Sequence, residues 1–396
     1  MLERGFTRLV PEAEALARLL ALVRPLPREE ELPLEAALDR VVARALRAPR
    51  DVPHYDRSAM DGYAVRAADT AGASAAGPVR LTLAERAGAG LAVPVRTGSP
   101  VPPGADAVLP VEDVERQGSR VDAQRRVRPG ENLGRRGEDV RAGEAVVPEG
   151  RVLRAADLGL LRSLGIENVP AVARPRVRVV PTGEELVAPG AAPREGQTID
   201  GNGIMLAAAV RGWGGEPEVV PLYDDDPGTL ARALVEGADV ADLLVTSGGT
   251  SVGERDRVVE ALTGAGEVVF HGVAIQPARP VAAGRVGQVP VLCLPGFPAA
   301  AFVAAFALLR PALARLARRP APEPRVAHGR LARKIVSTLG LRSYTRVRLE
   351  DGLVEPLRTS GAGVLSSIAR ADGFVITPEN VEGLPEGAEV QVVLIG

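Results

Sequence analysis

Residues 243–256, LLVTSGGTSVGERD, decide the fold class of this chain. A short apolar run leads into hydroxyl and glycine residues, and a charged helical stretch follows. The same alternation extends over residues 174–316. The apolar runs are 177–180, 218–222, 243–245, 268–270 and 289–294, and the helical stretches are 203–211, 227–235 and 255–262. Near-continuous apolar runs are typical of parallel strands buried on both faces. The sequence therefore predicts an α/β domain over residues 174–318, with its site beyond the carboxyl ends of the strands.

The sequence on either side of this domain has a different character. Residues 49–140 are rich in Gly and Pro and contain short Val-rich runs, which predicts a small β domain. Residues 325–396 follow a proline-rich linker and contain alternating strands, which predicts a second β domain. The segments 1–48 and 141–173 are predicted to form one discontinuous N-terminal domain. Its helices include one that begins near residue 11 and a second over residues 34–46.

Composition excludes several classes of protein. The 396 residues carry a net charge of −2, and no domain-sized segment is basic, so nucleic acid is not expected as the main partner. The single cysteine, Cys293, lies in an apolar run and is expected in the core. The longest apolar run, residues 299–309, is too short to span a bilayer. With no signal peptide at the start, the sequence predicts a cytoplasmic protein without a membrane segment.

The segment Ser58-Ala59-Met60-Asp61-Gly62-Tyr63-Ala64 is not explained by packing. It has neither the spacing of a helix face nor the alternation of a strand. Asp-Gly indicates a tight turn, in which Gly supplies backbone freedom. Such a turn would hold Ser58 and Asp61 in fixed positions.

Polar residues follow most of the predicted strands of the α/β domain. The turn that begins at Ser247 joins a strand to a helix through glycines, and such turns form backbone cradles for phosphate. Glu185, Asp225 and Asp256 follow different strands and are predicted to meet in one cleft. Carboxylate oxygens beside a phosphate-bearing substrate suit Mg²⁺. The alternative is that some of these carboxylates cap helices, as expected for Asp226 before Pro227.

Motifs along the chain together resemble the molybdopterin molybdenumtransferase family, which includes MoeA and the gephyrin E domain. In chain order they are SAMDGYA at 58–64, TGSPVPPGADAV at 97–108, GEN at 130–132 with RGED at 136–139, TGEEL at 182–186, SGGTSVGERD at 247–256, LPG at 294–296, and SG at 360–361 before ADG at 371–373. SAMDGYA is the most specific signature, and the resemblance covers nearly the whole chain. It implies a central three-layer α/β domain similar to the molybdopterin adenylyltransferase fold, a small β domain inserted near the N-terminus and a C-terminal β-barrel-like domain.

The resemblance also implies a reaction. Family members remove AMP from adenylylated molybdopterin and place molybdate on the dithiolene with Mg²⁺. They form elongated homodimers in which the SAMDGYA domain of one subunit faces the α/β domain of the other. A homodimer with a shared site is therefore expected here, with other molybdenum cofactor biosynthesis proteins as further partners.

The residues that match the family's motifs are expected to form the site. The expected catalytic residues are Asp61, Thr97, Glu185, Asp225 and Asp256, of which the last three would hold the metal. The expected substrate-binding residues are Ser58, Thr182, Gly183, Ser247, Gly248, Gly249, Thr250, Gly253, Gln276, Arg279, Pro295, Gly296, Pro298 and Ser360.

Three departures from the family pattern affect groups that bind anions. The usual KPGKP is QPARP at 276–280, the usual LPGNPVS is LPGFPAA at 294–300, and Gly134 replaces a common arginine. These departures leave two alternatives open. One is a non-catalytic paralogue that binds pterin or a partner protein, and the other is a transferase with altered oxyanion or pterin specificity.

Overall fold

The computed structural model describes residues 9–249, 256–357 and 363–395. Contacts between residues divide the chain into two compact units. Unit 1 comprises residues 1–30, 39–41 and 172–396, and unit 2 comprises residues 31–38 and 42–171. The finer division into four domains remains a prediction.

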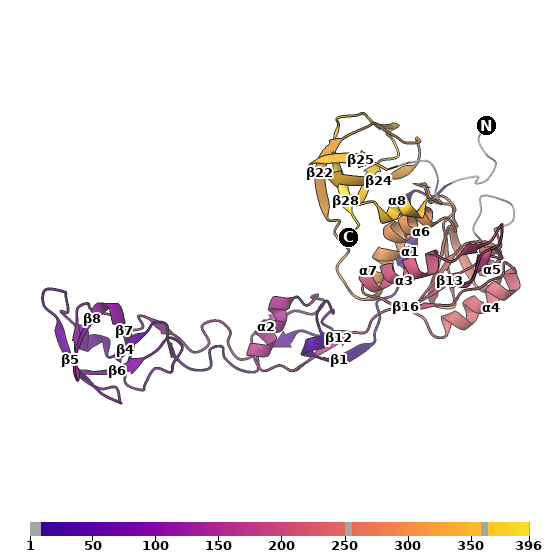
Figure 1. Cartoon of the computed structure of the whole chain (residues 1–396). Coiled ribbons are helices and arrows are strands. Elements are labelled where there is room, and N and C mark those ends of the chain that lie inside the picture. Colours follow the sequence, from indigo (N-terminus) through magenta and orange to yellow (C-terminus); the bar gives the residue numbers. More distant parts are fainter. Residues whose placement is uncertain (1–8, 250–255, 358–362, 396) are drawn as a thin grey trace. The chain divides into compact units, whose positions relative to one another are not determined.

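A six-stranded sheet organises unit 1 (Figure 1). In sheet order its strands are β16 (Glu216–Val219), β13 (Arg176–Pro181), β17 (Leu243–Ser247), β21 (Val289–Leu294), β20 (Ala282–Val286) and β18 (Glu267–His271). The first four strands are parallel, whereas β20 is antiparallel to both β21 and β18. All five predicted strands are present. The unpredicted β20 makes the sheet mixed rather than wholly parallel.

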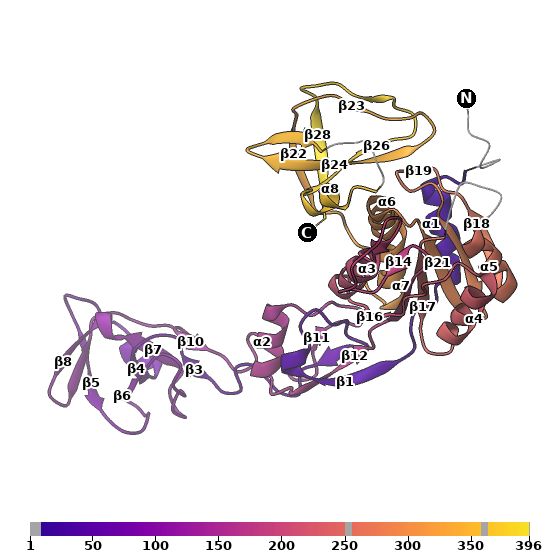
Figure 2. The ribbon, with the colours of Figure 1, turned by 45° about the vertical axis from the view of Figure 1, so that its right-hand side comes forward.

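Helices cover both faces of this sheet, which confirms the three-layer prediction (Figure 2). Neighbouring strand residues point to opposite faces. Val245 therefore packs with the helices α1 (Glu12–Leu22), α3 (Asn202–Gly212), α6 (Pro298–Ala304) and α7 (Arg310–Leu316). Leu244 packs with α4 (Pro227–Ala238) and α5 (Arg257–Ala265). Trp213, directly after α3, lies with its ring centroid 6.5 Å from that of Phe302.

A π-helical turn, η4 (Ala305–Leu309), connects α6 and α7 into one continuous helix. This helix spans Pro298–Leu316 and is the only one in the described residues that is long and apolar enough to cross a membrane. Its most apolar window is 72% buried inside the structure, which is typical of the core helix of a globular domain.

The C-terminal region of unit 1 is a closed five-stranded barrel, as predicted. Its hydrogen-bonded order is β24 (Arg342–Glu350), β25 (Leu353–Pro356), β22 (Val326–Leu331), β28 (Glu389–Leu394) and β26 (Gly373–Thr377), and β26 pairs back to β24. Aliphatic side chains such as Val347, Val354 and Val392 fill its core. The strand β19 (Ile275–Gln276) pairs in parallel with β24.

Unit 2 contains a curled sheet with the order β7 (Ala107–Pro110), β4 (Gly62–Val65), β6 (Leu91–Val95), β5 (Val79–Leu83), β9 (Arg120–Ala123) and β8 (Val114–Gln117). A separate core contains Leu161 of α2 (Ala155–Ser163), together with Val42 and Val147. The mixed α/β and β fold class is thus confirmed.

The remaining elements are short. The strands are β1 (Glu29–Pro33), β2 (Leu46–Arg47), β3 (Arg57–Ser58), β10 (Leu133–Gly134), β11 (Ala145–Val147), β12 (Asn168–Val172), β14 (Leu186–Val187), β15 (Thr198–Ile199), β23 (Ile335–Val336) and β27 (Gly383–Leu384). The helical turns are η1 (Leu34–Ala36), η2 (Ala67–Thr70), η3 (Val111–Asp113) and α8 (Leu365–Ala369).

The predicted helix over residues 34–46 is wrong. Only η1 forms there, and Asp39 adopts a positive φ of 61°, which a continuing right-handed helix does not allow. Val42 instead donates its backbone N–H to the carbonyl of Arg151 and bridges to Ala171. Tertiary pairing therefore overrides the helical pattern of this segment.

Gly62 is required for a different reason from the one predicted. It does not have a positive φ; it is the first residue of β4, where a Cβ would lie 2.1 Å from the carbonyl oxygen of Leu109. The close approach of β4 to β7 therefore excludes any side chain at this position.

We expect Gly62→Ala to destabilise unit 2 by about 1–3 kcal/mol, because the strands must separate to admit the methyl group. Gly159→Ala is the matched control, since a Cβ at this position in α2 meets nothing within 4 Å. The control should stabilise the unit by about 0.5–1 kcal/mol. Urea denaturation followed by circular dichroism measures both changes. Equal effects of the two substitutions on stability would show that the close approach to the carbonyl of Leu109 does not exclude a side chain at position 62.

Candidate active site

A cavity of about 1040 Å³ lies beyond the carboxyl ends of β13, β17 and β21. This is the edge of the sheet at which the sequence predicts a site. Among the predicted site residues, those that line the cavity are Glu185, Asp225, Gly248, Gly249, Arg279, Pro295, Gly296 and Pro298. These eight residues come from five chain segments that are far apart in sequence.

The turn after β17 is held by close backbone contacts. Gly248 has a φ of +117°, and a Cβ there would lie 2.0 Å from the carbonyl oxygen of Thr182. A Cβ on Gly296 would lie 3.2 Å from the Cα of Gly248. The side chains of Thr182 and Ser247 are buried beneath this turn. These two residues therefore support the cavity wall from inside the sheet rather than lining it.

Asn202 is a site residue that the sequence analysis missed. It is the first residue of α3, and its amide Nδ2 donates to Ser247 Oγ at 2.9 Å and to the carbonyl oxygen of Gly296 at 2.7 Å. One side chain thus ties the start of α3 to the ends of β17 and β21. The signal available in the sequence was Asp200-Gly201-Asn202 directly before the predicted helix, a run typical of helix starts.

Charged side chains of both signs meet at this cavity. Arg257, the first residue of α5, lies 3.2 Å from the carboxylate of Asp225 and 3.5 Å from that of Glu184. Arg257 and Arg279 both line the cavity, opposite in charge to Glu185 and Asp225. Arg257 was not predicted, because arginine is abundant throughout the chain and nothing in the sequence distinguishes this one.

Asp256 occupies a different position from the other two predicted carboxylates. It is buried, and its Oδ1 accepts the backbone N–H of Val259 at 3.1 Å, so it is the N-cap of α5. Its Oδ2 lies 3.0 Å from Nε2 of His271. Asp256 is not among the cavity-lining residues. Within the described part of the chain, no three His, Cys, Asp or Glu side chains are placed to hold a metal ion.

The remaining predicted residues of unit 1 are only partly described. Gln276 is half-buried on β19, and its Oε1 is buried with no hydrogen-bond partner in the described residues. The next residue, Pro277, lines the cavity. Gly183 lies on the loop after β13, where a Cβ would meet the carboxylate of Glu185 at 2.5 Å. Thr250, Gly253 and Ser360 lie outside the described residues.

Asp61 and Thr97 are brought together in unit 2. The backbone N–H and the hydroxyl of Thr97 both donate to Asp61 Oδ1, at 2.7 and 2.8 Å. The backbone hydrogen bond and then the hydroxyl bond hold the pKa of the Asp61 carboxyl below its usual value, with a smaller contribution from the charge of Arg96. Asp61 lines a separate cavity of about 360 Å³.

Ser58 is buried close to this turn, and its position indicates a structural use of the hydroxyl. The Ser58 hydroxyl donates to the carbonyl oxygen of Met60, within the bend that carries Asp61. The Ser58 backbone N–H donates to Ser99 at 2.9 Å, and its carbonyl accepts from Gly98 at 2.8 Å. Ser58 therefore connects the loop of Asp61 to the loop of Thr97.

Comparison with known families accounts for almost the whole chain. Residues 10–165 match the MoeA N-terminal region (domain I and II), residues 178–315 match a probable molybdopterin binding domain, and residues 328–395 match the MoeA C-terminal region (domain IV). The second range covers nearly all of the six-stranded sheet and most of its helices, and the third covers nearly all of the C-terminal barrel. Together the three ranges include most residues of both units.

Individual relatives agree with the family models. The chain is 36% identical over 395 residues to molybdopterin molybdenumtransferase 2 of Mycobacterium tuberculosis, covering 95% of this chain and 96% of the relative. It is 31% identical to the molybdopterin molybdenumtransferase of Haemophilus influenzae, covering 93% and 94%. The crystal structure of a molybdopterin biosynthesis MoeA protein from Pyrococcus horikoshii matches with a TM-score of 0.86 and 36% identity, covering 98% and 99% of the two chains.

We expect Asn202→Ala to destabilise unit 1 by about 1–3 kcal/mol, because the buried hydroxyl of Ser247 and the carbonyl of Gly296 both lose a hydrogen-bond donor. Asn380→Ala is the control, since Asn380 is exposed in the same unit. That substitution should change stability by no more than about 0.5 kcal/mol. Thermal unfolding by scanning calorimetry measures both variants. A similar small effect in the two would mean that the Asn202 amide does not hold the loops together.

Proposed function

Because the chain belongs to the MoeA family, we propose that it is a molybdopterin molybdenumtransferase of molybdenum cofactor biosynthesis. Its reaction breaks the phosphoanhydride of adenylylated molybdopterin, releases AMP and places molybdate on the dithiolene. The observation that carries the proposal is the cavity beyond the sheet, because it is lined by eight of the residues that the family motifs assign to the site.

Substrate binding is assigned to the cationic and helix-terminal parts of the cavity. Arg257 and Arg279 line the cavity and carry the positive charge that substrate phosphates require. Asn202 and Gly201 at the start of α3 also line it, and a helix N-terminus favours negative charge. Phe297 lies beside them, is 64% exposed, and offers an apolar surface for the pterin ring.

Mg²⁺ is included in the proposal as an ion that would neutralise phosphate charge when bound. Glu185 and Asp225 supply carboxylate oxygens at the cavity, but Asp225 is already paired with Arg257. The described carboxylates therefore do not by themselves complete a cation site. Substrate phosphates would have to contribute oxygens, as is usual for Mg²⁺ in nucleotide-binding proteins.

Asp61 is assigned a charge-based role. A carboxyl whose pKa is lowered stays ionised at neutral pH and is a weak proton acceptor. The two hydrogen bonds from Thr97 therefore support orientation of water or substrate by Asp61 over service as a general base. We further propose that the protein is a cytoplasmic homodimer. In this dimer, Asp61 of one subunit would act on substrate bound in the cavity of the other subunit.

Single-turnover release of AMP from adenylylated molybdopterin tests the reaction. With Mg²⁺ present, we expect release to depend on molybdate and to be complete in one turnover. Pterin binding measured separately by calorimetry is the control for substrate recognition. Intact binding without AMP release would instead identify a non-catalytic paralogue, in agreement with the altered residues Gln276, Phe297 and Ala300.

Mixing two inactive variants tests the shared site. We expect Asp61→Asn and Asp225→Asn each to abolish AMP release while remaining folded. If the two residues come from different subunits, a heterodimer has one intact site. After equal mixing and subunit exchange, activity should recover to about a quarter of that of the unsubstituted dimer. Asp351→Asn, at an exposed turn of the barrel, is the control for each variant. No recovery from verified heterodimers would place both residues in one subunit.

A further inference from the structure

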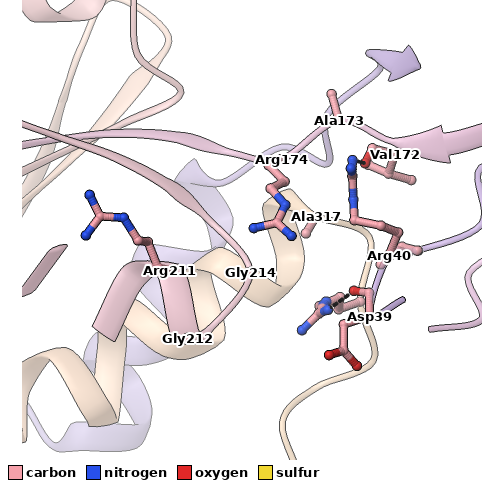
Figure 3. A pocket seen from close by; sticks show the side chains of 11 residues that line it. Asp39, Arg40, Val172, Ala173, Arg174, Arg211, Gly212, Gly214 and Ala317 are labelled. Atoms are coloured by element: carbon pink, nitrogen blue, oxygen red, sulfur yellow. Dashed lines mark hydrogen bonds between the residues drawn. The ribbon is translucent and has the colours of Figure 1, made fainter. Parts of the chain in front are cut away.

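A second cavity in unit 1 is lined by four arginines and is separate from the proposed active site. It has a volume of about 260 Å³ and shares no lining residue with the larger cavity. Arg40, Arg174, Arg211 and Arg319 line it together with Asp39 (Figure 3). These residues come from four segments: the chain before β2, the approach to β13, the last turn of α3 and the chain after α7. The cavity thus lies at the amino ends of the parallel strands.

The arginines differ in how their charges are compensated. Arg40 is buried, forms an ion pair with Glu30 and donates to the carbonyl oxygen of Val172 at 2.9 Å. Within the part of the chain that the structure describes, Arg319 donates only to a backbone carbonyl, that of Asp39. Among the described residues, Arg174 and Arg211 have neither an ion pair nor a side-chain hydrogen bond.

The cavity therefore carries excess positive charge. With Arg40 neutralised by Glu30, three arginines face the single carboxylate of Asp39, which leaves two positive charges. Burial lowers the pKa of Arg319; the charge of Asp39 opposes this shift, and the charges of Arg174 and Arg40 add to it. Arg319 is half-buried, whereas Arg174, Arg211 and Asp39 are exposed, so solvent screens part of the repulsion among these arginines.

Helix electrostatics explains only one of these arginines. Arg211 is in the last turn of α3, where a cation interacts favourably with the helix dipole. Arg174 and Arg319 are not in helices, so this explanation does not apply to them. Their convergence around a concave space instead matches the way arginines surround phosphate groups, with paired N–H donors directed at oxygen atoms.

We propose that this cavity binds a small divalent tetrahedral oxyanion, either free phosphate or the terminal phosphate of a small phosphomonoester. The two excess positive charges match the charge of such an anion. An adjoining cavity of about 520 Å³ shares Arg40, Arg174 and Arg211 and leaves space for the remainder of an ester. The site is independent of the proposed transferase reaction, because none of its residues lines the larger cavity.

Isothermal titration of the full chain tests the proposal with inorganic phosphate and glycerol 3-phosphate, at constant ionic strength in chloride buffer. Molybdate is excluded as a probe because it is a substrate of the proposed reaction. We expect saturable binding of one equivalent. Preference for phosphate would identify a free anion as the ligand, and preference for glycerol 3-phosphate would identify an ester.

Substitutions locate the binding site. Arg174→Gln and Arg211→Gln should each weaken binding by about tenfold or more, because each removes a charge-assisted hydrogen-bond donor. Arg232→Gln is the matched control, since this exposed arginine on α4 lines neither arginine-rich cavity. Scanning calorimetry provides a second readout: without added anion, the two cavity variants should be at least as stable as the unsubstituted chain, because repulsion is relieved.

Two results would overturn the proposal. One is the absence of saturable binding of either probe at millimolar concentrations to the folded, unsubstituted chain. The other is that the Arg174→Gln and Arg211→Gln variants bind the anion as strongly as the Arg232→Gln control does. Equal affinities would place the anion elsewhere on the protein.

Discussion

The close approach of backbones at Gly248 is the constraint on which the proposed active site depends. The chain leaves β17 at this residue and passes so near the carbonyl of Thr182 that no side chain fits at Gly248, and a Cβ on Gly296 would lie only 3.2 Å from the Cα of Gly248. Since these positions are the ends of three adjacent strands, the contact fixes the base of the cavity. The amide of Asn202 then fastens the start of α3 to the same place. Glu185, one of the charged residues that line the cavity, lies on the loop that leaves β13 next to Thr182.

Unit 2 uses a comparable arrangement on a smaller scale. Gly62 allows β4 to lie against the carbonyl of Leu109, and Asp61 directly precedes it. Ser58 joins the loop of Asp61 to the loop of Thr97 through backbone hydrogen bonds. These bonds hold Thr97 beside Asp61, to which it donates its backbone N–H. A carboxylate at an exposed bend would otherwise sample many orientations. Tight backbone packing next to it replaces burial as the means of holding it in place.

The sequence predicted what depends on local pattern and missed what depends on tertiary pairing. The strands of the α/β domain were recognisable because both their faces are buried, so their apolar runs are nearly continuous. The segment 34–46 misled because its apolar residues pair with distant strands rather than with one another. β20 was missed because Ala282, Ala283 and Gly284 are buried as small residues and give no strong apolar signal.

The site was predictable to a similar degree. Glycines and prolines in motifs identified the cavity wall, but the motif could not separate a carboxylate that lines the cavity from one that caps a helix. In the structure Asp256 caps helix α5, although the spacing of its motif suggested that it would line the cavity. Asn202 and Arg257 were missed for the opposite reason: their importance comes from the partners that folding brings to them.

The position of the single tryptophan has a practical consequence for studying this two-unit chain. Trp213 packs against Phe302 in unit 1, and unit 2 contains no tryptophan. Indole emission therefore reports the environment of one unit only. The tyrosines are divided between the units, with Tyr55 and Tyr63 in unit 2 and Tyr223 and Tyr344 in unit 1. Selective excitation of indole near the red edge of its absorption would thus follow the unfolding of unit 1 alone, without any added label.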